Sequence, residues 1–260
     1  MTQSTRDKVV LITGSRTGIG KETGRLFARK GYKVIFSGKK LGDCKDTVEK
    51  LTAEGLKVFE AQIDLTDISG LKENVKNALS IWGKLDLLIN NGAIIDPIAD
   101  LKNLTASDLE EAVKINFVAP TMLINHCWPH LKTSKGKIIN ILSGAAINPI
   151  EGWTAYCSTK AALHMINQQA HLEGLVDNIK SIGISPGMVD TNMQEKIRAS
   201  GVNQISKVKK DELISSETPA KFALWCATAE ANEFSGKMIS LNNSEVFKKY
   251  SLWVKREINQ

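Results

Sequence analysis

A tyrosine and a lysine four positions apart, with a serine thirteen positions before the tyrosine, are the side chains best spaced for proton chemistry. They are Tyr156, Lys160 and Ser143. In a helix, residues i and i+4 lie on one face, so the Lys160 ammonium would lie beside the Tyr156 phenol. A nearby cation lowers a phenol pKa that is otherwise about 10. The spacing therefore predicts a tyrosine that exchanges a proton near neutral pH. Because Tyr-x-x-x-Lys is common in helices, the surrounding elements must supply the context.

The first element is an apolar strand over 8–12 that runs into a glycine-rich turn, TGSRTGIG at 13–20, followed by a helical pattern. A strand, glycine turn and helix in this order direct backbone N–H groups and a helix N-terminus at a pyrophosphate. The turn lacks the Gly-Lys-Ser/Thr ending of a P-loop. It predicts a dinucleotide cradle made of Gly14, Ser15, Arg16, Thr17, Gly18, Ile19 and Gly20.

Cofactor preference is predicted from the end of the second strand, expected at 33–37. An NAD site would have an acidic residue there to hold the ribose 2′-hydroxyl. This chain has Gly38 and Lys39 instead, and Arg16 lies within the glycine turn. A guanidinium and an ammonium suit a 2′-phosphate. We therefore expect NADP(H) to be preferred, with NAD(H) as the alternative.

Further strands are predicted at 57–63, 85–89, 138–142, 179–184 and 237–241, with helical patterns before and between them, including one over about 41–54. This alternation is typical of a doubly wound α/β sheet. Polar or small residues follow several of the strands, at the edge where such sheets bind ligands. We predict one domain over 8–260, after a disordered or loosely held tail over 1–7. The polar, Lys-rich stretch at about 190–216 is predicted to be a lid over the substrate, or else a simple surface excursion.

Composition restricts the class of protein. The chain has 260 residues, 42% hydrophobic and 24% charged, with a net charge of +6. Its basic residues are interleaved with acidic ones, which favours solvated helix faces over a nucleic-acid surface. Four widely spaced cysteines indicate reduced thiols. No leader and no membrane-spanning stretch is evident, so we expect a cytoplasmic protein that binds neither membrane nor nucleic acid.

A buried amide, a pair of histidines and a set of apolar residues are further candidates for the site. Asn116 lies in an apolar stretch, where an amide must find partners: it braces the fold or holds a water beside Lys160. His126 and His130 have i, i+4 spacing, but no third ligand or His-Glu-x-x-His frame accompanies them, so no metal site is predicted. An apolar substrate pocket is expected from the residues Ile147, Trp153, Met188 and Met193.

The ordered set of motifs resembles the short-chain dehydrogenase/reductase family over about 8–242. The motifs are the glycine turn, Asp64, Asn90-Asn91, Asn116, Ser143, Tyr156-x-x-x-Lys160 and Pro186-Gly187 with Thr191. The resemblance implies a Rossmann-type sheet of seven parallel strands with helices on both faces. It implies that the cofactor also contacts Gly38, Lys39, Asp64, Leu65, Asn91, Gly92, Tyr156, Lys160, Pro186, Gly187, Val189 and Thr191.

The resemblance also implies catalytic roles. Tyr156 would be the acid in carbonyl reduction and the base in alcohol oxidation, and Ser143 would hydrogen-bond the substrate oxygen. Lys160 would lower the tyrosine pKa and hold the nicotinamide ribose. Asn116 would order a water that passes protons to Lys160.

The chain departs from the family pattern at its end. Leu241 to Glu245 stand where many members have Asp-Gly-Gly, and a charged tail to Gln260 is expected to follow. We expect a homodimer or homotetramer acting on a small or medium apolar ketone or alcohol. Two alternatives are a catalytically silent nucleotide-binding sensor or scaffold of the same fold, and an S-adenosylmethionine-dependent methyltransferase, which has no need of the Tyr-Lys pair.

Overall fold

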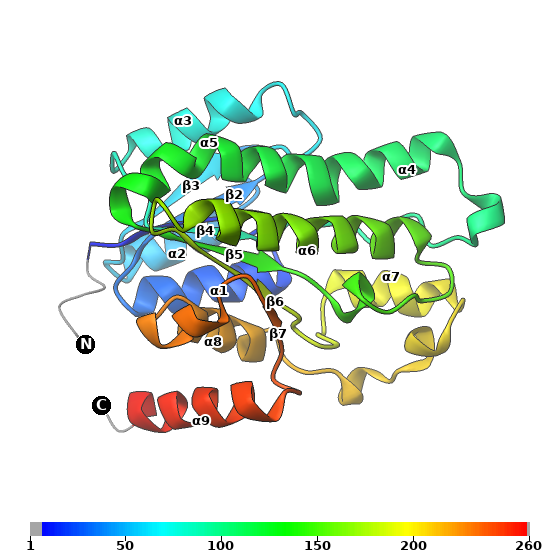
Figure 1. The fold of residues 1–260 in the computed structure, drawn as a ribbon. Helices are drawn as coiled ribbons and strands as arrows, with labels where there is room; N and C mark the ends of the chain where they lie inside the picture. Colours follow the sequence, from blue (N-terminus) through cyan, green and yellow to red (C-terminus); the bar gives the residue numbers. More distant parts are fainter. Residues whose placement is uncertain (1–6, 259–260) are drawn as a thin grey trace.

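The computed structural model describes residues 7–258 and shows seven parallel strands in the order β3-β2-β1-β4-β5-β6-β7. Helices cover both faces (Figure 1), so the predicted fold class is confirmed. The order reverses between β1 and β4, where doubly wound sheets bind ligands. The strands are β1 (Val9–Ile12), β2 (Lys33–Gly38), β3 (Val58–Gln62), β4 (Leu87–Asn90), β5 (Lys137–Ile141), β6 (Lys180–Ile184) and β7 (Met238–Ile239).

Two helical layers sandwich the sheet (Figure 1). One layer holds α1 (Gly18–Arg29), α2 (Lys45–Ala53), α8 (Glu217–Cys226) and α9 (Ser244–Ile258). The other holds α3 (Leu71–Ser80), α4 (Ala106–Val113), α5 (Ala119–Ser134) and α6 (Thr154–Gly174). Helix α7 (Asn192–Ser200) lies outside these two groups and follows β6. A π-helical turn, η2 (Lys114–Val118), joins α4 to α5, and the 3₁₀ turns are η1 (Leu101–Asn103), η3 (Gly144–Ala146), η4 (Gln204–Lys207), η5 (Lys210–Glu212) and η6 (Ala229–Phe234).

The apolar strands are buried on both faces, which explains their continuous hydrophobic runs. In β1, Val10 and Ile12 belong to the core cluster under α1 and α8. Their neighbours Val9 and Leu11 belong to the cluster under α3 and α5. All four are fully buried. Alternate side chains of a strand point to opposite faces, so one short strand contributes to both cores.

Residues 244–258 form a helix, where a charged tail was predicted. Val246, Tyr250 and Trp253 are buried on one side of α9. The Tyr250 ring meets Phe222 of α8 edge to face, with centroids 5.4 Å apart. The spacing i, i+4, i+7 is that of an amphipathic helix, whose apolar stripe is hidden in the sequence among lysines and glutamates.

Element boundaries differ from the predictions where turns are held by side chains. The helix expected from residue 41 begins at Lys45, because the Glu60 carboxylate accepts hydrogen bonds from the N–H groups of Gly42 and Cys44. Strand β7 has two residues rather than five. Of the tail expected over 1–7, residues 1–6 lie outside the described residues. No helix in the described range 7–258 is long and apolar enough to cross a membrane.

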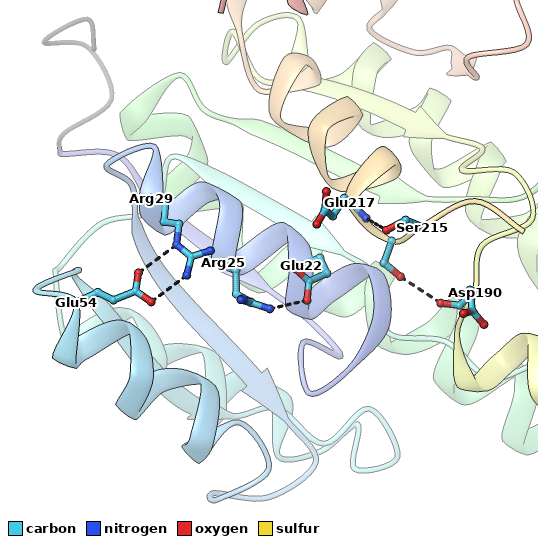
Figure 2. Close-up of polar contacts among 8 residues, drawn as sticks. Glu22, Arg25, Arg29, Glu54, Asp190, Ser215 and Glu217 are labelled. Atoms are coloured by element: carbon cyan, nitrogen blue, oxygen red, sulfur yellow. Dashed lines mark hydrogen bonds and ion pairs between the residues drawn. The ribbon is translucent and has the colours of Figure 1, made fainter. Parts of the chain in front are cut away.

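The 190–216 segment leaves and rejoins the domain at one place. The Asp190 N–H donates to the Ile214 carbonyl at 3.0 Å. The Ser216 hydroxyl donates to the Asp190 carbonyl at 3.4 Å, and Figure 2 draws the bond at Asp190. Figure 2 also shows Arg29 of α1 bound through two nitrogens to the Glu54 carboxylate just after α2. The segment is therefore a closed excursion that contains α7 and two 3₁₀ turns.

Candidate active site

A cavity of about 800 Å³ lies where the strands' carboxyl ends meet, and it extends under α7. Most of the predicted site residues line it. From the glycine turn and the next two loops these are Gly14, Arg16, Thr17, Gly18, Ile19, Gly38, Lys39, Asp64 and Leu65. From the loops after β4, β5 and β6 they are Asn91, Gly92, Ser143, Pro186, Gly187, Val189 and Thr191, and from α6 they are Tyr156 and Lys160. Ser15, Gly20 and Asn116 are absent from the lining.

The loops after β1 and β4 touch at the point where the sheet order reverses. Gly14 has φ +61°, and a Cβ there would lie 2.6 Å from the Gly92 Cα. The Thr13 hydroxyl accepts hydrogen bonds from the N–H groups of Asn91 and Gly92 at 3.0 and 3.1 Å. The Asn91 amide donates back to the Thr13 and Gly14 carbonyls. Gly14 and Gly92 have no side chains, so their backbone is accessible from the cavity. This fits the close approach of a pyrophosphate.

Ser15 and Gly20 shape the glycine turn from behind. The Ser15 hydroxyl accepts a 2.7 Å hydrogen bond from the Ser37 N–H, and Ser15 is fully buried. A Cβ on Gly20 would lie 2.5 Å from the Asn91 amide nitrogen. Both residues therefore hold the turn against its neighbours rather than facing the cavity.

The far end of the cavity carries the two cations predicted to select NADP. Arg16 and Lys39 both line it. The turn after Lys39 is held by Asp43, whose carboxylate accepts a hydrogen bond from the Lys40 N–H at 3.1 Å. Asp43 also lies against Gly38, since a Cβ at Gly38 would meet the Asp43 Cβ at 2.4 Å. A bulkier residue at 38 would displace this turn and the cation that it presents.

Tyr156 and Lys160 lie one turn apart at the start of α6, facing Ser143 at the end of β5. The Lys160 ammonium donates to the Ile141 carbonyl at 2.7 Å and lies 5.6 Å from the centre of the Tyr156 ring. Both side chains are buried. The Ser143 hydroxyl accepts a 3.2 Å hydrogen bond from the Ala145 N–H and lines the same cavity as Tyr156 and Lys160.

The expectation that Lys160 lowers the tyrosine pKa is corrected in this structure. Burial raises the pKa of Tyr156 to about 12, and the hydrogen bond from Ser143 lowers it in part. Burial also lowers the pKa of Lys160 to about 8. The ammonium is directed at the Ile141 carbonyl and lies beside the ring rather than pairing with the hydroxyl. Desolvation by burial is therefore the main cause of both pKa shifts.

Asn116 sits on the π-helical turn η2, and its amide is bonded to the loop after β4. Its oxygen accepts from the Ile94 N–H at 2.9 Å, and its nitrogen donates to the Ile94 carbonyl at 2.8 Å and to Thr159 of α6 at 3.2 Å. Of the two interpretations of its sequence context, these contacts are those of a brace. They position Ile94, which lines the cavity.

The sequence analysis missed several residues that line the cavity, because segments far apart in the chain bring them together. They include Ile95, Asp96, Asn148, Ile150, Gln194, Lys196, Ile197, Ile205 and Asn242. It also placed Ile147 in the pocket, whereas Ile147 is 64% exposed and absent from the lining. Trp153, Met188 and Met193 do line the cavity, as expected.

In the described range, no group of three or more His, Cys, Asp or Glu side chains is arranged to hold a metal ion. All four cysteines are unpaired, and Cys44, Cys127 and Cys226 are buried. The titratable and hydroxyl groups that meet in the cavity include Ser143, Tyr156 and Lys160, and the glycine turn and the two distal cations fit a bound dinucleotide.

The fold and this site define an oxidoreductase of the Rossmann type. Residues 8–201 match the family model for short chain dehydrogenases. Similar proteins include an uncharacterised oxidoreductase of Schizosaccharomyces pombe, 33% identical over 75% of this chain and 76% of its own. A benzil reductase of Saccharomyces cerevisiae is 32% identical over 74% of this chain and 75% of its own.

Solved structures of other proteins have the same fold. A short-chain dehydrogenase/reductase from S. cerevisiae superposes with a TM-score of 0.82 at 27% identity, covering 92% of this chain and 98% of its own. ElxO with NADP bound shares the fold at 24% identity, with a TM-score of 0.78 over 90% of this chain and 96% of its own. The chain belongs to the short-chain dehydrogenase/reductase family.

Proposed function

We propose that this enzyme is an NADPH-dependent carbonyl reductase whose acid is Tyr156. The observation that carries the proposal is the convergence of Ser143, Tyr156 and Lys160 on one cavity with the glycine turn. Bound NADP(H) supplies the hydride for reduction and accepts it in the reverse reaction. The protein residues bind the two reactants, exclude water and move the proton.

Tyr156 donates its phenolic proton to the substrate oxygen as that oxygen gains negative charge. Ser143 donates a hydrogen bond to the same oxygen and stabilises the charge that develops. Burial keeps the phenol protonated across the neutral range, because it raises the Tyr156 pKa. Lys160, whose ammonium donates to the Ile141 carbonyl, would hold the nicotinamide ribose. Asn116 holds the Ile94 loop in place beside them and, as the family pattern implies, would order the water through which protons reach Lys160.

NADP(H) is proposed over NAD(H) on charge. Arg16 and Lys39 line the distal end of the cavity, and a guanidinium and an ammonium suit a phosphate dianion. The same fold accommodates NADP in ElxO. Asp43, the nearest carboxylate to Gly38, is engaged by the Lys40 N–H.

The substrate is proposed to be a small or medium apolar ketone, or the matching alcohol. Trp153, Met188 and Met193 supply an apolar wall beside Tyr156. Relatives in yeast and Bacillus carry the name benzil reductase, and benzil is an apolar diketone. Residues 190–216 are proposed to act as the lid, since their two ends meet and α7 covers the cavity.

A homodimer or homotetramer is proposed, with α6 in the interface. Met165 and Leu172 lie on one face of α6 and are 61% and 62% exposed. Exposed apolar faces of this kind mark association surfaces. Light scattering of the purified protein tests this, and a monomer in which Leu172→Glu changes nothing would contradict it. A cytoplasmic location suits the unpaired cysteines.

The proposed function is tested by supplying NADPH or NADH with a panel of ketones that includes benzil, and by following loss of the reduced cofactor. Turnover with NADPH is expected. If no ketone or alcohol reacts with either cofactor, while NADPH still binds, the protein is the silent sensor of the same fold. A protein that binds S-adenosylmethionine and not NADPH would be the methyltransferase.

A further inference from the structure

An ion pair crosses the substrate side of the cavity. The Lys196 ammonium donates to the Asp96 carboxylate at 2.5 Å. Asp96 lies in the loop after β4 and Lys196 on α7, and both line the cavity. Their side chains are 49% and 58% exposed, so a ligand in the cavity can reach them.

Asp96 and Lys196 are the charged side chains on the substrate side of the cavity among the described residues. Among the described residues that line the cavity, Arg16, Lys39 and Asp64 belong to the loops after β1, β2 and β3, at the distal end. Lys160 is buried and bonded to the Ile141 carbonyl. Near the pair the lining is mostly apolar, with Ile95, Ile150, Trp153, Met193 and Ile197 beside the polar residues Asn192 and Gln194. Lys196 is thus a half-exposed cation at a mostly apolar part of the cavity, and Asp96 is the group that neutralises it.

The pair is not needed to keep α7 in place. Ile197, the next residue, is buried in a cluster with Ile95 and Trp153. Asn203 donates from its amide to the Glu151 carbonyl at 2.8 Å, which anchors the far end of the segment. Half-exposed ion pairs also contribute little to stability. The contacts therefore leave the pair free to serve recognition.

We propose that Asp96 is a specificity-determining residue: by neutralising Lys196 it makes the pocket select uncharged carbonyl compounds over those that carry a carboxylate. Without the Asp96 charge, Lys196 presents an unpaired ammonium to the same apolar pocket and attracts an anionic substrate. This inference names the substrate class of the proposed reductase and rests on that function.

Binding gives a test that does not depend on turnover. Benzoate and benzamide have the same shape and differ in charge, and their affinities for the NADP⁺-loaded protein are measured by calorimetry. The wild type should bind benzoate no more tightly than benzamide. Asp96→Asn should shift the affinity ratio toward benzoate by about fivefold, as expected for one charge contact near water. The double variant Asp96→Asn/Lys196→Gln should lose that shift.

Several results would overturn the inference. These are a wild type that already prefers benzoate, an Asp96→Asn protein with an unchanged ratio, a double variant that keeps the shift, and no measurable binding of either probe. Equal gains for both probes would show that the pair only restricts access.

Turnover separates the inference from the proposed function. The kcat/KM values for phenylglyoxylate and its methyl ester are compared, and their ratio should rise in Asp96→Asn. If the wild type reduces no ketone at all, the proposed function fails, while the benzoate to benzamide ratios still decide the role of Asp96.

Discussion

The Lys160 ammonium donates a 2.7 Å hydrogen bond to the carbonyl of Ile141, the last residue of β5. A lysine of α6 is thereby fastened to the sheet edge at which the dinucleotide is expected. Ser143 follows two residues after this carbonyl, so the strand end also places the hydroxyl that meets Tyr156. The contact between α6 and the end of β5, rather than a flexible loop, thus fixes the lysine of the group proposed to transfer the proton.

Tyr156→Phe should remove the proton donor and leave the cavity shape almost unchanged. We expect kcat to fall by about 10²–10⁴-fold, while the NADPH affinity stays within about twofold, since only one hydroxyl is lost. NADPH consumption and fluorescence titration measure the two quantities. Tyr32→Phe, at a buried tyrosine of the distant core, is the matched control and should retain activity. Equal losses in both variants would contradict the role of Tyr156.

Lys39→Ala should weaken NADPH binding by about tenfold, equal to ~1.4 kcal/mol, and leave NADH binding nearly unchanged. The reason is that only the 2′-phosphate would meet this ammonium. Lys40→Ala is the control, because Lys40 is adjacent and exposed but absent from the cavity lining. If Lys39→Ala does not change the ratio of the NADPH and NADH affinities, a group other than Lys39 binds the 2′-phosphate.

Asn116→Leu should lower the free energy of unfolding by about 1–3 kcal/mol, because the N–H and carbonyl of Ile94 lose their partners. Urea denaturation measures the change. Activity should fall as well, since Ile94 lines the cavity. Asn77→Leu, at an exposed position of α3, is the control. A stable variant that loses activity alone would favour the water-holding role over the brace.

Lys137 predicts a pH dependence of stability. Its buried ammonium donates to the carbonyls of Cys226 and Thr228, and burial lowers its pKa to about 8. The unfolded value lies above the folded one, so the cost of burying the charge is full below pH ~8 and declines as pH rises toward ~10.5. The wild type should therefore gain stability over Lys137→Met by about 1–2 kcal/mol between pH 7.5 and 10.

Urea unfolding at several pH values checks this expectation. Lys50→Met, at an exposed site of α2, serves as the matched control. A difference between wild type and Lys137→Met that does not vary with pH would show that the buried ammonium does not titrate in this range.

Trp253→Ala tests whether α9 belongs to the core. Trp253 is 7% exposed and stacks near Tyr250, so its removal should cost about 3–5 kcal/mol of unfolding free energy. The neighbouring Leu252 is 53% exposed, and Leu252→Ala should cost far less. Similar small losses in both variants would show that the helix is only loosely attached.

The strands, the glycine turn and the Tyr-Lys spacing were readable from the sequence, because each depends on residues close together in the chain. Continuous apolar runs such as 9–12 are typical of buried parallel strands, and the turn at 14–20 needs glycine where backbones approach. The helix α9 was missed, since three apolar residues among charged ones form a stripe only once the chain coils.

By itself the sequence determined the fold class, and it predicted the dinucleotide cradle and the proton-transfer side chains, since these follow from local periodicity and from side-chain chemistry. Only the tertiary structure decided what surrounds them. Burial, which no residue carries alone, set the direction of the Tyr156 and Lys160 pKa shifts. The Asp96–Lys196 pair joins residues one hundred positions apart, a contact that exists only because β4 and α7 fold to the same edge of the sheet.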